Sequence, residues 1–294
     1  MTILTPTYNR AYILTKAFDS LCRQSDFDFE WIIVDDGSTD DTEKLVNSWM
    51  TDDLPFKLRY IKQVNGGKHR ALNRGINEAE YGYVLILDSD DHLTDDAVAK
   101  VHAWIKTIEG KDDFAGVSGL RGWINKNTPI GGSGDGRTYI DAKNTERRRY
   151  HLSGDKAEVY KTDILKKYRF PEFEGEKFLS EHVVWDSIAK DGYKIRWFNE
   201  VIYKCEYLED GLTKSTSYKL QLNSFQGFTL STKMRIELEQ FPWNYYAIGT
   251  YHHVANLKGI GKSDIKKLLQ IKGYQLCIGT TIFKMNELKK KVLK

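Results

Sequence analysis

Cysteine and proline are both scarce in this chain of 294 residues. The three cysteines, Cys22, Cys205 and Cys277, are far apart, and none belongs to a CxxC pair. This spacing excludes a disulfide framework, argues against a structural zinc site and favours a reducing compartment. With only 5 prolines and 13% aromatic residues, the composition is that of a packed globular protein, so a disordered or collagen-like chain is excluded as well.

Long hydrophobic runs are also missing. The longest run without a charged residue covers residues 240–257, and its glutamine, asparagine, threonine and histidine residues make it a poor membrane span. The residues after Met1 form a short strand-like run instead of a basic segment followed by a long apolar one, so no signal peptide is expected. We therefore expect a protein that is either free in the cytoplasm or peripheral at the inner membrane.

The net charge of +3 hides an uneven distribution. Residues 213–294 carry 14 Lys and Arg against 4 Asp and Glu, whereas residues 1–212 carry 30 against 37. The acidic part favours a metal or sugar site. Three roles stay open for the basic part: a solvated face packed on the rest, attachment to an anionic membrane surface, and oligomerisation. No recognition motif accompanies the positive charge, so nucleic acid binding is not expected.

Short apolar runs alternate with stripes at helical spacing over the first hundred residues. The runs predict strands near residues 3–4, 31–34, 58–61 and 83–87. Such alternation with short connections is typical of βαβ units, so we predict an α/β fold with a doubly wound, mostly parallel sheet. From residue 213 the chain is basic and helical in pattern, which predicts one domain over 1–212 and a helical C-terminal extension over 213–294.

Polar clusters follow the ends of these four predicted strands. They occupy residues 5–10, 35–40, 65–70 and 88–91. Because ligands bind outside the carboxyl ends of the strands in such sheets, we expect the four clusters to meet at one edge and to form one site.

The acidic cluster contains Asp88, Ser89, Asp90 and Asp91, directly after the most apolar predicted strand. Two carboxylates about 5 Å apart repel by roughly 3 kcal/mol at an effective dielectric of 20, and a cation relieves this repulsion. Hard oxygen ligands at an open site suit Mg²⁺ or Mn²⁺, which also bridge to a phosphate. The alternative is a solvated turn that leads into the next helix.

The other three clusters carry groups suited to a nucleotide. Asp35 and Asp36 can accept hydrogen bonds from a base or ribose, and Tyr8 can stack on a base. Residues 66–70, with the sequence GGKHR, place glycines and cations at the start of a helix, which favours an anion. The Walker pattern is absent, because positions 62 and 69 lack its Gly and its Ser or Thr. A helix cap or a surface turn is the alternative for each cluster.

In this order and spacing, the clusters TPTYNR, VDDGSTD, GGKHRALN and LDSDD resemble those of the family 2 glycosyltransferases of the GT-A fold. The resemblance is strong over residues 1–110, looser to about 212, and unspecific over 213–294. It implies inverting transfer of a sugar from a nucleotide-diphosphate donor, usually a UDP-sugar, with Mn²⁺ or Mg²⁺ as cofactor.

The resemblance also implies a role for individual residues. Asp90 matches the second acid of the metal-binding pair and Asp88 the first, so these two are the predicted metal ligands. The residues expected to hold the donor nucleotide are Thr5, Pro6, Tyr8, Arg10, Asp35, Asp36, Gly67, Lys68, Asp88 and Ser89.

An inverting transfer further needs a base that takes the proton of the acceptor hydroxyl as its oxygen attacks the anomeric carbon. Family members commonly supply this base from a Glu-Asp pair at the start of a late helix. Here Glu181 matches the Glu, and His182 stands in place of the Asp. We predict Glu181 as the base, with His182 as the alternative, because a neutral imidazole can also accept a proton.

Two other functions stay open at this point. A nucleotidyltransferase would use the same acids and release pyrophosphate, although its basic loop after the first strand is absent. A non-catalytic sugar-nucleotide-binding module is the second alternative, because the usual Asp is missing at position 182. By resemblance, the expected partners are the sugar donor and a glycan or lipid-linked glycan acceptor, in bacterial surface polysaccharide and cell-envelope biosynthesis.

Overall fold

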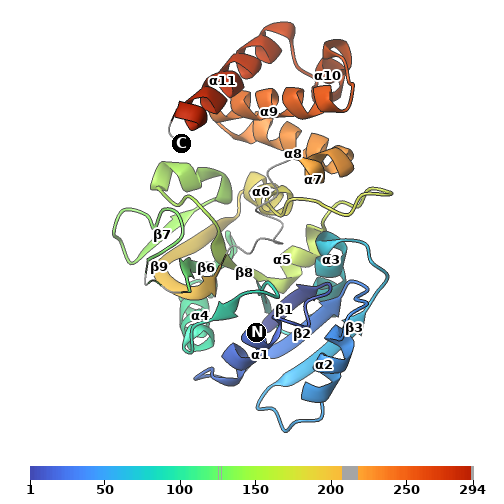
Figure 1. Ribbon diagram of the computed structural model, residues 1–294. Coiled ribbons are helices and arrows are strands. Elements are labelled where there is room, and N and C mark those ends of the chain that lie inside the picture. The colour runs from blue at the N-terminus through green and yellow to red at the C-terminus, as the bar shows by residue number, and fades with distance from the viewer. Residues whose placement is uncertain (125, 127, 207–217, 293–294) are drawn as a thin grey trace. The chain divides into compact units, whose positions relative to one another are not determined.

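The computed structural model describes residues 1–124, 126, 128–206 and 218–292 (Figure 1). The chain forms two compact units. The sheet unit contains Met1–Phe170 and Ser187–Leu208, and the helical unit contains Pro171–Asp186 and Glu209–Lys294. The domain boundary that we expected at residues 212 and 213 lies outside the described residues.

Four parallel strands form the first half of the sheet, in the order β3-β2-β1-β4. Their bounds are β1 (Thr2–Thr7), β2 (Glu30–Asp35), β3 (Lys57–Lys62) and β4 (Tyr83–Ile86). Thr7 is in register with Asp35, and Asp35 with Lys62, so the first three strands end at the same level. The α/β fold predicted from the sequence is therefore confirmed, and its four polar clusters follow neighbouring strand ends.

Helices α1 (Thr15–Cys22), α2 (Thr42–Trp49) and α3 (Lys68–Glu78) connect these strands. Ile3 of β1 belongs to the same buried cluster as Trp49 of α2. The next residue, Leu4, packs against α3 so closely that a Cβ atom on Gly75 would lie 2.1 Å from Leu4 Cδ1. Because side chains alternate along a strand, an unbroken apolar strand is covered by helices on both faces.

The second half of the sheet continues in the order β8-β6-β9-β5, and β7 also pairs with β9. Strands β6 and β9 are parallel, whereas β8, β5 and β7 run antiparallel to their neighbours, so the complete sheet is mixed. The remaining elements of the sheet unit are β5 (His92–Leu93), α4 (Ala97–Lys106), β6 (Phe114–Trp123), β7 (Tyr139–Ala142), the 3-10 helix η1 (Asn144–Tyr150), β8 (Lys156–Lys161), α5 (Thr162–Lys167) and β9 (Lys194–Cys205). Helix α6 (His182–Lys190) begins in the helical unit and ends in the sheet unit.

The helices that lie entirely within the helical unit are α7 (Lys219–Asn223), α8 (Phe225–Leu238), α9 (Trp243–Leu257), α10 (Lys262–Leu269) and α11 (Gly273–Val292). Helices α9 and α11 approach most closely where two glycines meet, since a Cβ atom on Gly249 would lie 2.1 Å from the Gly279 carbonyl oxygen. The uncharged run at residues 240–257 contains α9, whose buried face joins the core of this unit. Over the described part of the chain, no helix is long and apolar enough to span a membrane.

Residues 171–186 are hydrogen bonded to α8 and to the residue before it. The Glu176 carboxylate accepts hydrogen bonds from the backbone N–H groups of Gln226, at 2.7 Å, and Gly227, at 2.9 Å. The Phe178 N–H donates to Ser224 Oγ at 3.2 Å. Because the first N–H groups of a helix have no partner within it, Glu176 caps α8 from a segment almost fifty residues earlier.

Candidate functional site

The loops after β1 and β2 are joined into one surface by backbone and side-chain hydrogen bonds. The Asp36 N–H donates to the Thr7 carbonyl at 2.8 Å, and the Asn9 N–H donates to Ser38 Oγ at 2.8 Å. The Thr39 N–H returns a bond to Asn9 Oδ1 at 2.8 Å. The first two predicted clusters therefore do converge at one edge of the sheet.

The first loop contributes fewer accessible side chains than its sequence suggests. Thr5 and Pro6 are buried within β1, and Thr5 Oγ1 accepts a hydrogen bond from the Trp31 indole at 2.9 Å. Tyr8 is 47% exposed and Arg10 is half-buried. Among the predicted donor-binding residues of this loop, Tyr8 and Arg10 are thus the ones that a ligand can reach.

The Asp35 carboxylate is buried and bonded within the fold. It accepts hydrogen bonds from the Ser38 N–H at 2.7 Å and from the Tyr60 hydroxyl at 2.5 Å. Burial and the contact with Asp35 raise the pKa of Tyr60 well above its usual value, so the phenol stays a donor. Asp35 therefore fixes the turn after β2 and ties it to β3.

The Asp36 carboxylate organises the loop before α3. It accepts hydrogen bonds from the Gln63 side chain at 2.8 Å and from the N–H groups of Gly66, at 2.9 Å, and Gly67, at 2.7 Å. Gly67 has a φ of 97°, a conformation that side-chain-bearing residues rarely adopt. Asp36 and Gly67 together fix the point at which α3 begins, with Lys68 as its first residue.

Lys68 connects the third cluster to the acidic one. Its Nζ lies 2.5 Å from Asp88 Oδ1, and the guanidinium of Arg121 lies 3.1 Å from Asp88 Oδ2. Burial alone would raise the pKa of Asp88, but the two cations outweigh it and hold that pKa well below its usual value. Asp88 is thus ionised, with one cation on each carboxylate oxygen.

Arg121 and Tyr203 belong to this site but were not among the residues predicted from the sequence. Arg121 of β6 lies over the ring of Tyr203 of β9, with 4.2 Å between guanidinium and ring centre. The Tyr203 hydroxyl accepts a hydrogen bond from the Asp88 N–H at 2.9 Å, and Arg121 also lies 3.7 Å from Asp91. In the sequence, Arg121 stands out only as the one charged residue in the run GVSGLRG at residues 116–122, whose other residues are small or apolar.

Asp90 differs from Asp88 in its surroundings. Within the described ranges, its carboxylate forms no ion pair, although the residue is half-buried beside the buried Ser89. Burial and the negative charge of Asp88 raise the pKa of Asp90, while Arg10 and Lys68 oppose part of this effect. Burial, with the charge of Asp88, also raises the pKa of Asp91 to about 8.

These groups fit a hard divalent cation. Asp90 offers a carboxylate where nearby negative charge is incompletely balanced, and Asp88 lies two residues away in the sequence. Apart from the undescribed residues, the chain holds no group of three or more ligating His, Cys, Asp or Glu side chains. Water and phosphate oxygens would complete the coordination, as they commonly do for Mg²⁺.

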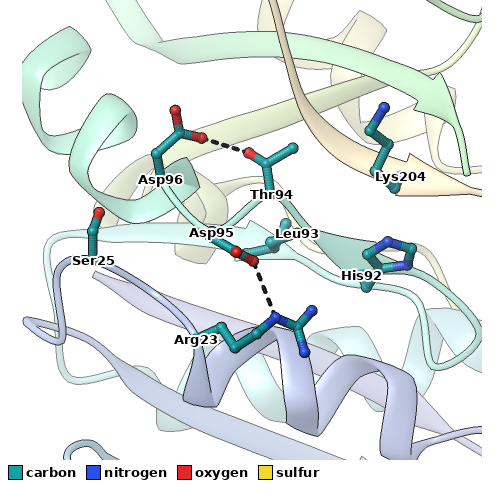
Figure 2. A pocket seen from close by; sticks show the side chains of 8 residues that line it. All are labelled: Arg23, Ser25, His92, Leu93, Thr94, Asp95, Asp96 and Lys204. Atoms are coloured by element: carbon teal, nitrogen blue, oxygen red, sulfur yellow. Dashed lines mark hydrogen bonds and ion pairs between the residues drawn. The ribbon is translucent and has the colours of Figure 1, made fainter. Parts of the chain in front are cut away.

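A separate pocket of about 550 Å³ opens beside β5 and the end of α1 (Figure 2). Two of its acids are already bonded within the pocket, since Arg23 Nε lies 3.2 Å from Asp95 Oδ1 and Thr94 Oγ1 donates to Asp96 at 2.8 Å. The residues that line it are Arg23, Ser25, His92, Leu93, Thr94, Asp95, Asp96 and Lys204. None of the predicted donor-binding residues is among them, so we do not assign this pocket to the donor.

Glu181 and His182 belong to the helical unit. Both ring nitrogens of His182 are hydrogen bonded: Nδ1 lies 2.7 Å from Ser180 Oγ, and Nε2 lies 3.0 Å from Ser231 Oγ. Burial, with a smaller effect of Arg235, lowers the pKa of His182 to about 4. His182 is therefore a neutral ring held between two hydroxyl groups.

Two relatives of known role align with parts of this chain. The GalNAc(5)-diNAcBac-PP-undecaprenol beta-1,3-glucosyltransferase of Campylobacter jejuni is 28% identical over 192 residues, which are 65% of this chain and 60% of that protein. A PGL/p-HBAD biosynthesis glycosyltransferase of Mycobacterium bovis is 37% identical over 111 residues, which are 37% of this chain and 43% of that protein. The chain thus spans less than two thirds of the length of either relative.

Solved structures share the fold over almost the whole chain. S. aureus TarS 1–349 in complex with UDP-GlcNAc aligns with a TM-score of 0.62 and 21% identity, covering 96% of this chain and 80% of that chain. The mannosyltransferase PcManGT from Pyrobaculum calidifontis in complex with GDP-Man and Mn²⁺ gives 0.56 and 18%, covering 97% and 87%. At these identities the likeness establishes the α/β fold with its C-terminal helical region.

A family model also matches the N-terminal part of the sequence. The model of glycosyl transferase family 2 covers residues 2–169, which include all four loops at the edge of the sheet and both predicted metal ligands. Because the match extends over more than half of the sequence, this chain belongs to glycosyl transferase family 2.

Proposed function

We propose that this chain catalyses an inverting, metal-dependent transfer of a hexose-type sugar from a nucleotide-diphosphate donor, a UDP-sugar, to a hydroxyl group of a glycan or glycolipid. The observation that carries this proposal is the carboxylate of Asp90. It lies half-buried at the carboxyl edge of four parallel strands, beside the ionised Asp88 and without an ion-pair partner among the described residues. Membership of family 2 supports the reaction class.

The donor nucleotide is assigned to the surface formed by the loops after β1, β2 and β3. Tyr8 and Arg10 are its accessible side chains, and Lys68 adds positive charge at the start of α3, where the helix dipole also favours an anion. Asp35 and Asp36 act mainly by fixing these loops, since both carboxylates are bonded within the fold. A solved TarS complex with UDP-GlcNAc supports a UDP-linked donor by analogy.

Asp90 and Asp88 are the residues that would hold Mn²⁺ or Mg²⁺. When bound, the metal supplies positive charge that stabilises the leaving diphosphate. Lys68 and Arg10 are the side chains of this chain that contribute further positive charge near these acids, because both lower the pKa of Asp90. Arg121 holds Asp88 ionised and in place.

Glu181 is proposed as the general base. In the reaction, the acceptor oxygen attacks the anomeric carbon as the bond from that carbon to the diphosphate oxygen breaks. The carboxylate takes the hydroxyl proton, the nucleoside diphosphate leaves, and the anomeric configuration inverts. The neutral His182, bonded at both nitrogens, supports Glu181 over the imidazole for this role.

The acceptor and the cellular setting are proposed from the relatives. The Campylobacter jejuni relative is named for an undecaprenol-linked glycan, and the Mycobacterium bovis relative for PGL/p-HBAD biosynthesis. We place this chain in bacterial surface polysaccharide and cell-envelope biosynthesis, with a glycan or lipid-linked glycan acceptor. The protein would then act in the cytoplasm or in peripheral contact with the inner face of the membrane.

Calorimetric titration with UDP tests the donor and metal assignments. We expect the wild-type protein to bind UDP in the presence of Mn²⁺, and Asp90→Asn to lose this metal-dependent binding. Asp53→Asn is a matched control, because Asp53 is an exposed acid on the loop after α2. Equal UDP binding by wild type and Asp90→Asn would reject Asp90 as a metal ligand.

The product distinguishes the remaining alternatives. Incubation with a UDP-sugar and an acceptor should release UDP, because the anomeric bond is the one that breaks. Release of pyrophosphate in a parallel incubation with UTP and a sugar 1-phosphate would support nucleotidyl transfer instead. A non-catalytic binding module would be supported if UDP binds in a metal-dependent way but neither UDP nor pyrophosphate is released, with a glycan and a lipid-linked glycan both tested as acceptors.

A further inference from the structure

Helix α11 of the helical unit presents a second apolar face besides the one that it buries. Leu276 and Phe283 lie in the interior. On the outside, Tyr274 is 58% exposed, Ile278 39%, Met285 55% and Leu288 62%. We call these last four residues the apolar stripe.

The positions of these residues place them on one side of the helix. With the exposed Thr281 included, they recur at alternating steps of four and three residues, which keeps them in line along an α-helix. A helix that is apolar on two opposite faces needs a second apolar environment, because its own unit covers only one of them.

Exposed lysines flank the apolar stripe. At 3.6 residues per turn, Lys284 and Lys289 lie on opposite sides of it. Neither forms an ion pair with a described residue. The only acid in the sequence of α11 is Glu287, which pairs with Lys290 at 2.8 Å. Positive charge beside the stripe is thus uncompensated along its length.

This charge decides between the two kinds of surface that cover an apolar helix face. A second copy of the chain would bring two segments together that each carry 14 basic against 4 acidic residues over 213–294. An anionic lipid surface is complementary in both respects, since it accepts apolar side chains at its boundary and attracts lysines at its headgroups.

Aromatic residues lie close to the same helix. Tyr246 of α9 contacts Phe283 of α11 with 6.0 Å between ring centres, and Trp243 lies 6.5 Å from Tyr246. Trp243 is 41% exposed and Phe241 is 68% exposed. Because Phe283 lies on the buried face of α11, these aromatic residues border the side of the helix opposite the apolar stripe and are not part of the surface considered for lipid binding.

We propose that the apolar stripe and its two flanking lysines bind the surface of an anionic lipid bilayer, with α11 lying in the plane of the interface. The inference rests on the proposed function in one respect only, namely that a lipid-linked acceptor gives the contact a purpose. Its test uses binding and no turnover, so it fails or succeeds independently of the glycosyl transfer.

Sedimentation of the full chain with lipid vesicles tests the proposal. We expect binding to vesicles of phosphatidylcholine mixed with phosphatidylglycerol, and at least tenfold weaker binding to phosphatidylcholine alone. Lys284→Glu/Lys289→Glu should lower the affinity for the mixed vesicles by at least about tenfold, because each lysine near the surface contributes attraction. Ile278→Ser/Met285→Ser should have an effect of similar size, because it removes the inserted side chains.

Matched variants in the sheet unit control for net charge and surface polarity. Lys44→Glu/Lys106→Glu reverses two exposed lysines, and Met50→Ser removes an exposed apolar side chain that is 49% accessible. Both should bind the mixed vesicles as wild type does. All changed side chains are exposed, and circular dichroism would confirm that each variant is folded.

Three results would overturn the proposal: no binding to anionic vesicles, equal losses in the α11 variants and the controls, or vesicle binding unchanged by either α11 variant. Sedimentation velocity without lipid adds a fourth. A dimer that Ile278→Ser/Met285→Ser dissociates, with vesicle binding unaffected, would assign the stripe to a second copy of this chain.

Discussion

Lys68 Nζ lies 2.5 Å from Asp88 Oδ1, so the first residue of α3 balances the charge of the first acid of the proposed metal-binding pair. The guanidinium of Arg121 lies 3.1 Å from the other carboxylate oxygen of Asp88. Two cations therefore balance Asp88, and Asp90 is left as the acid without an ion-pair partner among the described residues. The structure thus distinguishes two carboxylates that look equivalent in the sequence, because one has two cationic partners and the other has no ion-pair partner among the described residues.

Removing the charge of Lys68 should weaken donor binding. We expect Lys68→Met to lower UDP affinity by about 10- to 100-fold, since a charge-assisted hydrogen bond contributes roughly 1.5–3 kcal/mol. Titration calorimetry with Mn²⁺ measures the change. Lys62→Met is the matched control, because Lys62 is exposed and its ion-pair partner is Glu43 instead of Asp88. Equal UDP affinity in Lys68→Met and Lys62→Met would contradict a donor-binding role for Lys68.

Removing Arg121 should act on stability. Arg121→Met leaves Asp88 and Asp91 without their shared cation in a mostly buried place, which typically costs about 3–5 kcal/mol. Urea-induced unfolding measures this difference. Arg23→Met removes a more exposed ion pair, with Asp95, and should change the free energy of unfolding by less than about 1 kcal/mol. Similar losses in the two variants would show that Arg121 acts as an ordinary surface cation.

Much of the sheet unit was predictable because its information is local. Each of the four strands is a short apolar run with a polar cluster at its carboxyl end, and parallel pairing brings such ends together. The contributions of Arg121 and Tyr203 were not predictable in this way. They come from β6 and β9, and their proximity to Asp88 depends on strand order in the mixed half of the sheet.

Burial also decides which of the predicted donor-binding residues a ligand can reach. Thr5, Pro6, Asp35 and Asp36 were predicted to contact the donor, but in the structure they are buried or hydrogen bonded to neighbouring parts of the fold. A loop motif gives the residue type but not the direction of the side chain. The sequence also could not predict that residues 171–186 belong to the helical unit, because this depends on their contacts with α8, which is distant in the sequence.

The Glu176 cap offers a test of that grouping. Glu176→Gln keeps the size of the side chain but removes the charge that faces the first N–H groups of α8, so we expect a loss of about 1–2 kcal/mol in the free energy of unfolding. Glu174→Gln is the control, because Glu174 is exposed two residues earlier. Urea titrations followed by circular dichroism compare the two. Identical unfolding curves would mean that the cap does not stabilise the helical unit.

His182 should make stability depend on pH. Its pKa in the folded state is about 4, below the ordinary value of 6.5, so the unfolded chain binds more protons between these values. The neutral ring therefore makes its full contribution to the free energy of unfolding above pH 6.5, and this contribution is lost as the pH falls toward 4. The charged group that acts on the ring is Arg235 of α8, which disfavours the same protonation.

Unfolding in urea across this pH range measures the effect. The wild type should lose more stability on acidification than His182→Asn, which has no titrating ring. His151→Asn serves as the control because His151 is exposed, and its pH dependence should follow that of the wild type. Parallel pH profiles for wild type and His182→Asn would contradict a buried neutral ring.

The choice between Glu181 and His182 as the base follows from separating binding from turnover. Glu181→Gln should bind UDP with Mn²⁺ as wild type does, because it changes no residue of the proposed donor site, and its turnover should fall by about 10²–10⁴-fold. His182→Asn should keep most of its turnover at neutral pH, because a ring bonded to Ser180 and Ser231 is not available as a base. The measurement is release of UDP from a UDP-sugar in the presence of acceptor, alongside UDP titration of each variant. If His182→Asn loses turnover while Glu181→Gln retains it, and both bind UDP normally, the imidazole is the base and the hydroxyl groups around it must release one ring nitrogen during the reaction.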